Sequence, residues 1–168
     1  MLNKLKKSDA KGFTIIEVMI VLAIAGLIIL IVLLAVPALQ RNGRNTAIKN
    51  DASALTAAVA EFASNNDGAL PLVANTTPAG GGTGPTVTLN NAAGNAATAK
   101  VQSSTAILFN TGAQTITPKA GEITVDYKAT CPTAVAGTSV TTVASNRGTA
   151  VVYGLELASS IAVKCIDS

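Results

Sequence analysis

The hydrophobic residues of this chain are concentrated in one block near the N-terminus. Between Phe13 and Leu39, 23 of the 27 residues are hydrophobic, and residues 18–36 contain no charged side chain. As a helix, residues 18–36 would rise about 28 Å, which is close to the hydrocarbon thickness of a bilayer. Fourteen of them are Leu, Ile or Val, and together these favour insertion by roughly 6 kcal/mol. The pattern predicts a membrane-spanning helix, even with Glu17 at its edge.

Three kinds of N-terminal segment share this hydrophobic pattern. A secretory signal peptide would use the lysines as its basic region and Ala23-Ile24-Ala25 as a cleavage site before Gly26. Against that interpretation, the apolar run continues to Val36, and Glu17 interrupts its start. A plain signal anchor that holds a domain outside the membrane is the second possibility. The third depends on the residues at the junction between the lysines and the apolar run.

Beyond Gly43 the apolar residues take up a helical spacing. One apolar face is predicted from Ile48, Ala52, Leu55, Val59 and Phe62, which are spaced four, three, four and three residues apart. Off that face lie Asn50, Asp51, Ser53, Thr56 and Glu61. The run Asn65-Asn66-Asp67-Gly68 and then Pro71 predict the end of the helix. A coiled-coil seam has the same spacing, but this stripe lasts only about two heptads.

The C-terminal part of the chain reads as a small β head. Residues 74–100 are rich in Ala, Asn, Thr and Gly, and we expect them to form a surface loop. Strand-like runs follow at 107–109, 115–117, 122–127, 139–143, 150–157 and 161–166. The last two predict a hairpin across Ala158-Ser159-Ser160. We therefore expect an α+β fold, in which an antiparallel sheet of about four strands packs on the apolar face of residues 48–62.

Composition argues against catalysis and metal binding. The chain has no His and only 3% aromatic residues, so the commonest general base and metal ligand at neutral pH is missing. No nucleophile is paired with a base, and the two cysteines lack the CxxC spacing of metal sites. We expect no enzymatic activity, no cofactor and no metal.

The junction Lys11-Gly12-Phe13-Thr14-Ile15-Ile16-Glu17-Val18 decides between the three kinds of segment. A Gly, then an aromatic residue, then an acid four residues on, all before an apolar helix, resembles the class III signal of type IV prepilins and pseudopilins. The close resemblance covers about residues 7–39. It implies a pilin-like fold, with one long N-terminal helix continuing into the head, and no catalytic role.

The resemblance also implies how the chain is processed and where it assembles. A prepilin peptidase would cut after Gly12 on the cytoplasmic side, and the new N-terminal Phe13 would be N-methylated. The expected path runs from a single-pass membrane precursor, through an inner-membrane assembly platform, to an extracellular filament of identical subunits. In that filament, Glu17 would pair with the α-amine of Phe13 of a neighbouring subunit. The alternative for Glu17 is that its carboxylate reaches the lipid headgroups of a plain anchor.

The two cysteines, Cys131 and Cys165, lie near the C-terminal end. In a domain presented outside the membrane, such a pair is typical of a disulfide, and the resemblance implies the same pairing. Closing a loop of about 35 residues would stabilise the fold by about 4 kcal/mol in the chain-entropy model. Two reduced, buried thiols are the alternative.

These observations predict four segments. They are a leader at 1–12, a membrane and filament-core helix at 13–39, an amphipathic helix at 40–66, and a globular β head at 67–168. The formal charge of +3 reflects 12 cations and 9 acids. Removing the leader takes away four Lys and Asp9, which leaves eight of each, so we expect no nucleic-acid binding by the mature chain. A pilus subunit is the predicted function; the alternatives are a pseudopilin, a minor pilin, or a membrane-anchored adhesive domain.

Overall fold

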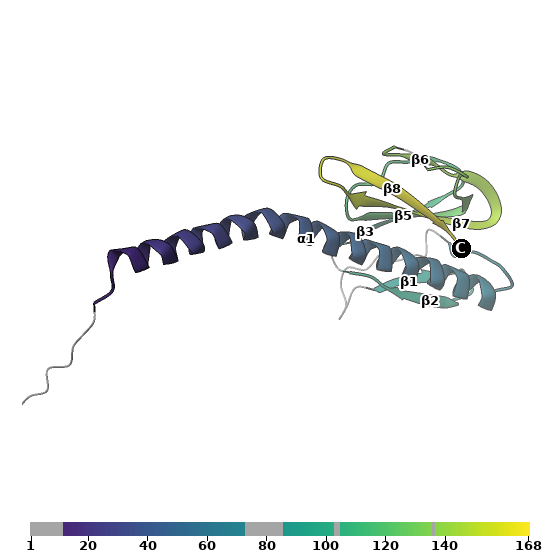
Figure 1. Cartoon of the computed structure of the whole chain (residues 1–168). Helices are drawn as coiled ribbons and strands as arrows, with labels where there is room; N and C mark the ends of the chain where they lie inside the picture. The colour runs from purple at the N-terminus through teal and green to yellow at the C-terminus, as the bar shows by residue number, and fades with distance from the viewer. Residues whose placement is uncertain (1–11, 73–85, 103–104, 136) are drawn as a thin grey trace, which may run out of the picture. The chain divides into compact units, whose positions relative to one another are not determined.

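The computed structural model describes residues 12–72, 86–102, 105–135 and 137–168. The chain divides into two compact units, Met1–Gln40 and Arg41–Ser168, which are described separately. One long helix, α1 (Ile15–Asn65), is followed by a series of strands (Figure 1). The strands are β1 (Thr86–Asn90), β2 (Ala96–Lys100), β3 (Ala106–Thr111), β4 (Thr115–Ile116), β5 (Glu122–Thr130), β6 (Val140–Thr141), β7 (Val143–Glu156) and β8 (Ile161–Asp167). This α+β arrangement confirms the predicted fold class.

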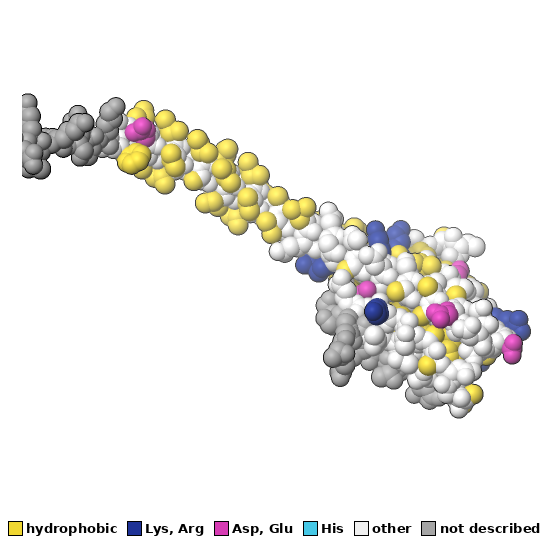
Figure 2. Space-filling view, turned by 90° about the horizontal axis from the view of Figure 1, so that it is seen from below, with side chains coloured by type: hydrophobic (Ala, Val, Ile, Leu, Met, Phe, Trp, Pro, Cys, Tyr) yellow, Lys and Arg dark blue, Asp and Glu magenta, His cyan; other side chains and the backbone are white. Residues whose placement is uncertain are grey.

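In the first unit, α1 leaves its apolar side chains exposed around the whole helix. The large hydrophobic residues from Phe13 to Leu39 are all at least 39% exposed, and hydrophobic atoms dominate the visible face of this segment in Figure 2. By length and composition α1 is able to cross a membrane. The helix continues on both sides of Pro37, although proline cannot donate a backbone hydrogen bond.

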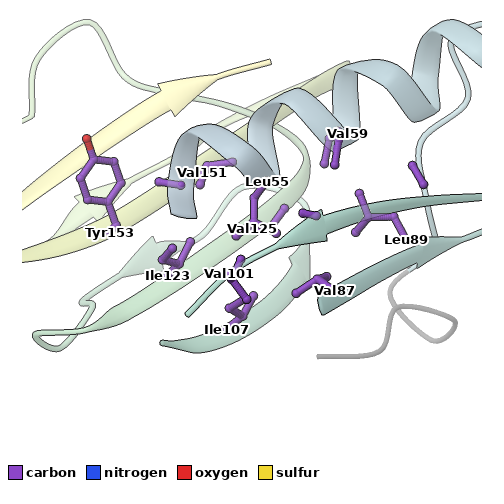
Figure 3. Close-up of a cluster of buried hydrophobic side chains, with 14 of the residues drawn as sticks. Leu55, Val59, Val87, Leu89, Val101, Ile107, Ile123, Val125, Val151 and Tyr153 are labelled. Carbon is purple, nitrogen blue, oxygen red and sulfur yellow. The ribbon is translucent and has the colours of Figure 1, made fainter. Parts of the chain in front are cut away.

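In the second unit, α1 supplies the apolar face on which the head is built. Every residue of the predicted stripe from Ile48 to Phe62 is buried. These side chains share one hydrophobic cluster with residues of β1, β2, β3, β5 and β7. Figure 3 shows Leu55 of α1 among Val125 and Val151 of the sheet, with Leu89 of β1 closer to Val59. Burial of this stripe therefore holds the strands to the helix.

Asp51 lies on a buried part of α1, contrary to the prediction from the spacing of apolar residues. The spacing argument placed it off the apolar stripe, but its side chain is only 5% exposed. Its Oδ2 accepts hydrogen bonds from the backbone N–H of Gln102, at 3.1 Å, and from the Thr105 hydroxyl, at 2.5 Å. A buried carboxylate is tolerated when hydrogen-bonded, so Asp51 fastens the segment after β2 to the helix.

The main sheet has four strands in the order β3-β5-β7-β8. Pairs β5–β7 and β7–β8 are antiparallel, and β7–β8 forms the predicted hairpin, with Val152 opposite Cys165. One pair departs from the expected antiparallel sheet, because β3 and β5 run parallel. Between them the chain passes through β4, which pairs with β6 in another sheet, so it re-enters the main sheet in the same direction.

The expected surface loop at 74–100 was wrong over its second half. Residues 73–85 lie outside the described part of the chain, but β1 and β2 form an antiparallel hairpin that belongs to the core. Val87 pairs with Ala99, and Leu89 pairs with Ala97, and all four are buried. The sequence did not predict β2, because Ala has a low preference for strands. In this hairpin, each buried Ala of β2 pairs with a larger residue of β1.

A third layer covers the face of the main sheet opposite α1. Ile116 of β4 and Val140 of β6 pack with Val152 and Val163 in a second apolar cluster. Strand β5 is therefore buried on both faces, and its Thr124 and Asp126 are at most 1% exposed. Alternation of apolar and polar residues along a strand is typical of a sheet with one solvated face, but here the covering layer buries the polar residues as well.

Gly154 allows the chain to cross this face closely on its way to β5. Ala120 forms a parallel bridge with Gly154, and a Cβ at Gly154 would lie 2.5 Å from the Lys119 carbonyl oxygen. Since real Cβ atoms do not come so close to a backbone oxygen, a larger residue would push the crossing segment away.

We predict that Leu89→Ala lowers the free energy of unfolding by about 2 to 5 kcal/mol, because it opens a cavity in the main core. Urea unfolding of the chain in detergent, followed by tyrosine fluorescence from Tyr127 and Tyr153, measures this change. Leu108→Ala is the matched control, since Leu108 lies in β3 but is 50% exposed. Equal, small effects of the two substitutions would show that the β1–β2 hairpin is not part of the core.

Candidate functional site

The junction residues lie at the very start of α1. Gly12, Phe13 and Thr14 precede the helix, which begins at Ile15. Phe13 is 90% exposed, and a Cβ built on Gly12 would meet nothing within 4 Å. Both residues that flank the Gly12–Phe13 peptide bond are therefore exposed.

Thr14 and Glu17 cap the first turn of the helix reciprocally. The backbone N–H of Thr14 donates to Glu17 Oε2 at 2.9 Å, and the Thr14 hydroxyl donates to the same oxygen at 2.8 Å. In return, the backbone N–H of Glu17 donates to Thr14 Oγ1 at 3.3 Å. This is a capping box, in which two residues satisfy N–H groups that have no partner within the helix. The acidic side chain also opposes the positive end of the helix dipole.

The sequence reasoning missed Thr14, although its signal was present. Thr14-Ile15-Ile16-Glu17 has the Thr-x-x-Glu spacing of a capping box before an apolar run. Both bonds reach Oε2, and among the described residues nothing bonds to Oε1. Glu17 thus has a local role and one carboxylate oxygen that can still accept a hydrogen bond.

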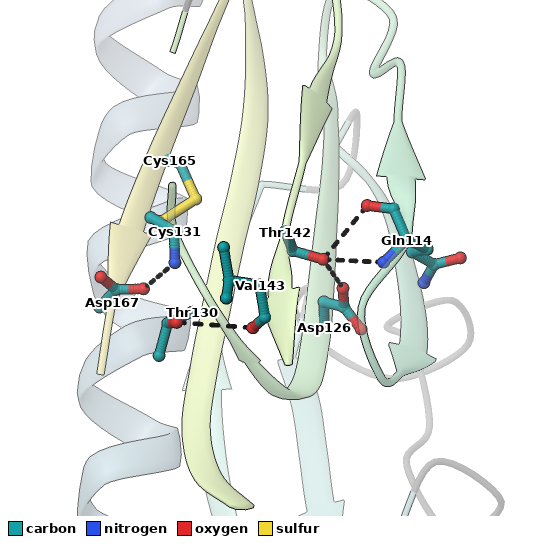
Figure 4. The surroundings of a disulfide bond; sticks show 8 residues. All are labelled: Gln114, Asp126, Thr130, Cys131, Thr142, Val143, Cys165 and Asp167. Atoms are coloured by element: carbon teal, nitrogen blue, oxygen red, sulfur yellow. Dashed lines mark hydrogen bonds between the residues drawn. A yellow bond between two sulfur atoms is a disulfide. The ribbon is translucent and has the colours of Figure 1, made fainter. Parts of the chain in front are cut away.

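The cysteines belong to the head and not to the junction. A disulfide joins Cys131, just after β5, to Cys165 in β8, with 5.8 Å between their Cα atoms (Figure 4). The backbone N–H of Cys131 also donates to Asp167 Oδ1 at 2.5 Å. The covalent bond and this hydrogen bond fix the chain after β5 against the C-terminal strand.

A polar clamp joins α1 to the end of β7. The guanidinium of Arg44 donates to both carboxylate oxygens of Glu156, at 2.9 and 3.0 Å. Beside this pair, the Asn45 side-chain amide donates to the Glu156 carbonyl, and the Glu156 N–H donates to the Asn45 side-chain oxygen, both at 2.8 Å. Two bidentate contacts fix the orientation of α1 against the end of β7 better than isolated surface charges would. Sequence reasoning missed them because more than a hundred residues separate the partners.

We predict that Thr14→Val destabilises the first helical turn by about 1 kcal/mol, the usual cost of losing an N-cap. Amide hydrogen exchange in detergent micelles would show faster exchange at residues 14–18, with the rest of α1 unchanged. Thr14→Ser is the control, since it keeps the hydroxyl and the cap. Unchanged exchange in Thr14→Val would mean that the capping box does not stabilise the helix start.

Comparison with known proteins bears on this same segment. Residues 7–33 match the family model of the prokaryotic N-terminal methylation motif. Neither a search of curated proteins nor one of solved structures gave a match. The matched residues include Gly12, Phe13, Thr14 and Glu17 and extend through the apolar helix, which confirms the resemblance drawn from the junction. This chain carries the signature of type IV prepilins at its N-terminus.

Proposed function

We propose that this chain is the precursor of a structural subunit of a type IV pilus filament. The observation that carries the proposal is a methylation motif that spans the junction and the first part of a helix whose apolar side chains have no cover within the described chain. Such a surface needs lipid or other helices around it. A membrane supplies the first environment, and a bundle of identical helices supplies the second.

Processing would occur at the junction. Cleavage after Gly12 by a prepilin peptidase leaves Phe13 as the first residue of the mature chain and exposes a new α-amine, which the same pathway methylates. Gly12 suits the position because the chain there is exposed and lacks a side chain. Thr14 stays in the mature protein, so cleavage leaves the capping box intact.

Assembly would exchange lipid contacts for helix packing without any new covalent bond. Lipid tails are as apolar as leucine, so the net gain comes from side-chain packing and from polar pairs within the bundle. Glu17 would provide such a pair by accepting a hydrogen bond from the α-amine of Phe13 in a neighbouring subunit. Its Oε1, which has no partner among the described residues, is the oxygen available for that bond.

The head would form the outer surface of the filament. Its visible face in Figure 2 shows only scattered charged side chains among many neutral ones, and the Cys131–Cys165 disulfide suits an oxidising exterior. Pseudopilin precursors carry the same kind of signal and remain the alternative. Abundance in sheared surface fibres separates the two, because a major pilin dominates that fraction.

We predict that the mature protein begins with N-methylated Phe13. N-terminal sequencing and intact mass of protein purified from membranes or filaments provide the test. Gly12→Val should block cleavage, because the side chain adds bulk beside the cut bond, and should leave the full precursor in the membrane. A chain that starts at Met1 or at Gly26 would overturn the proposal in favour of a plain anchor or a secreted product.

We also predict that Glu17→Val leaves membrane insertion intact but reduces filament yield at least tenfold. Removing a carboxylate makes the helix more apolar, so insertion cannot suffer, whereas the intersubunit pair is lost. Sheared-fibre yield and membrane fractionation measure the two effects.

Two variants control for loss of the helix cap and for loss of an acidic side chain elsewhere on α1. Thr14→Val removes the capping hydroxyl but keeps the carboxylate, so it should reduce assembly less than Glu17→Val does. Glu61→Ala removes an exposed acid from the same helix and should assemble normally. Normal filaments from Glu17→Val would refute the pairing role of Glu17.

A further inference from the structure

Asp126 is a fully buried carboxyl group in the middle of the head. It lies on β5, on the face of the main sheet opposite α1, and is 0% exposed. In the sheet register it lies between Asn110 of β3 and Ala150 of β7. The layer formed by β4 and β6 covers this face, so the carboxyl group is enclosed between two sheets.

Thr142 joins the carboxyl group to this covering layer (Figure 4). Its Oγ1 lies 2.6 Å from Asp126 Oδ2 and 3.2 Å from the carbonyl oxygen of Gln114. The backbone N–H of Gln114 donates to the same Oγ1 at 3.0 Å, and the N–H of Thr142 donates to the Gln114 carbonyl at 2.9 Å. The Thr142 hydroxyl therefore contacts both Asp126 and the residue before β4.

The number of protons decides how these contacts are satisfied. A hydroxyl has one proton and two lone pairs. If Asp126 is ionised, that proton must go to the carboxylate, and the contact between Oγ1 and the Gln114 carbonyl lacks a donor. If Asp126 is neutral, its own O–H donates to Thr142 Oγ1, and the Thr142 hydroxyl then donates to Gln114. Only the neutral acid gives every one of these contacts a donor and an acceptor.

The surroundings also disfavour a negative charge at this position. Asp126 Oδ1 is buried and has no hydrogen-bond partner among the described residues. A buried carboxylate oxygen without a partner is costly, whereas a buried carbonyl oxygen costs much less. Desolvation raises the pKa of Asp126 above its ordinary value, and this outweighs the lowering by the side chains of Thr142 and Gln114.

We propose that Asp126 keeps its proton in the folded head and that this proton completes a latch between β5 and the β4–β6 layer. The latch consists of Asp126, Thr142 and Gln114. With the proton in place, the chain of donors runs from the carboxyl group to the Thr142 hydroxyl and on to the Gln114 carbonyl. Loss of the proton breaks the last bond and leaves a charge enclosed between the sheets, so the covering layer opens more easily.

No charged side chain of the described residues contributes to the pKa shift of Asp126, whose causes are burial and the side chains of Thr142 and Gln114. Among the described residues, β3, β4, β6 and the turn at 112–114 carry no titratable side chain. On β7, Tyr153 lies in the cluster with α1, Glu156 pairs with Arg44, and Arg147 lies outside the paired register with β5. Asp167 of β8 shares the sheet row across Ala150 but already accepts the Cys131 N–H.

The direction of the pH effect follows from linkage. Because the pKa of Asp126 is raised in the folded state, its contribution to stability is complete below the unfolded value of 3.8. That contribution is lost as the pH rises through the folded pKa. Across this window, the equilibrium constant for opening the β4–β6 layer should rise by up to about tenfold per pH unit, the limit for one proton.

The first experiment needs no substitution. Carboxyl ¹³C NMR of the isotope-labelled full chain in detergent micelles follows each aspartate as the pH is changed. Asp126 should titrate above 3.8, the ordinary value for an aspartate. Titration of Asp126 at or below that value would overturn the proposal.

The second experiment compares variants by Tm between pH 3.5 and pH 8. Asp126→Asn has the shape of the neutral acid and keeps a donor for Thr142, so its Tm should exceed that of the wild type by an amount that grows with pH. Asp67→Asn is the matched control and should show no growing gap. If the difference in Tm between Asp126→Asn and the wild type is constant with pH, or favours the wild type at high pH, then Asp126 is ionised in the folded head.

Thr142→Val checks the latch itself. It removes the hydroxyl but not the carboxyl group, so amides of residues 114–116 and 140–142 should exchange faster even at low pH, after correction for intrinsic rates. Unchanged exchange of these amides would overturn the role of Thr142 as the link. None of these measurements depends on filament assembly, so the latch can fail without affecting the proposed function, and the reverse also holds.

Discussion

The apolar surface of the N-terminal half of α1 is the constraint on which the rest of the structure depends. Its large side chains from Phe13 to Leu39 are not covered by any other described part of the chain, so this surface requires lipid or other helices around it. The head must therefore be stable by its own packing. It achieves this with the Ile48–Phe62 stripe, which shares one cluster with residues of β1, β2, β3, β5 and β7, and with a disulfide that restricts the C-terminal region.

The two apolar surfaces of α1 differ in kind, and the sequence showed this directly. Residues 18–36 are apolar around the whole helix, which is typical of a membrane span, whereas residues 48–62 are apolar on one face. Both patterns depend on local spacing, and strands β5 and β8, the second half of β7 and the β7–β8 hairpin were predicted for the same reason. The junction Gly12-Phe13 and Glu17 were identified equally locally, from a motif within a few residues.

The features that sequence reasoning missed depend on contacts between distant residues. The alanines of β2 gave no strand signal, because their role is visible only beside Val87 and Leu89 of β1. The parallel pairing of β3 with β5 follows from the route through β4, which local alternation does not encode. The burial of Asp51 and Asp126 required knowledge of the segments that cover them. Thr14 is different, because its capping signal was present and was overlooked.

Three carboxyl groups of this chain lie in apolar or buried surroundings, and each obtains its hydrogen bonds in a different way. Asp51 is buried on α1 and is satisfied by two donors from the segment after β2. Glu17 lies in the first turn of an apolar helix and accepts hydrogen bonds from Thr14 on one oxygen, while its other oxygen has no partner among the described residues. Asp126 has too few donors for a charge, so its own proton must complete the network. The number of available donors therefore separates a structural anchor, a candidate assembly contact and a proton-dependent latch.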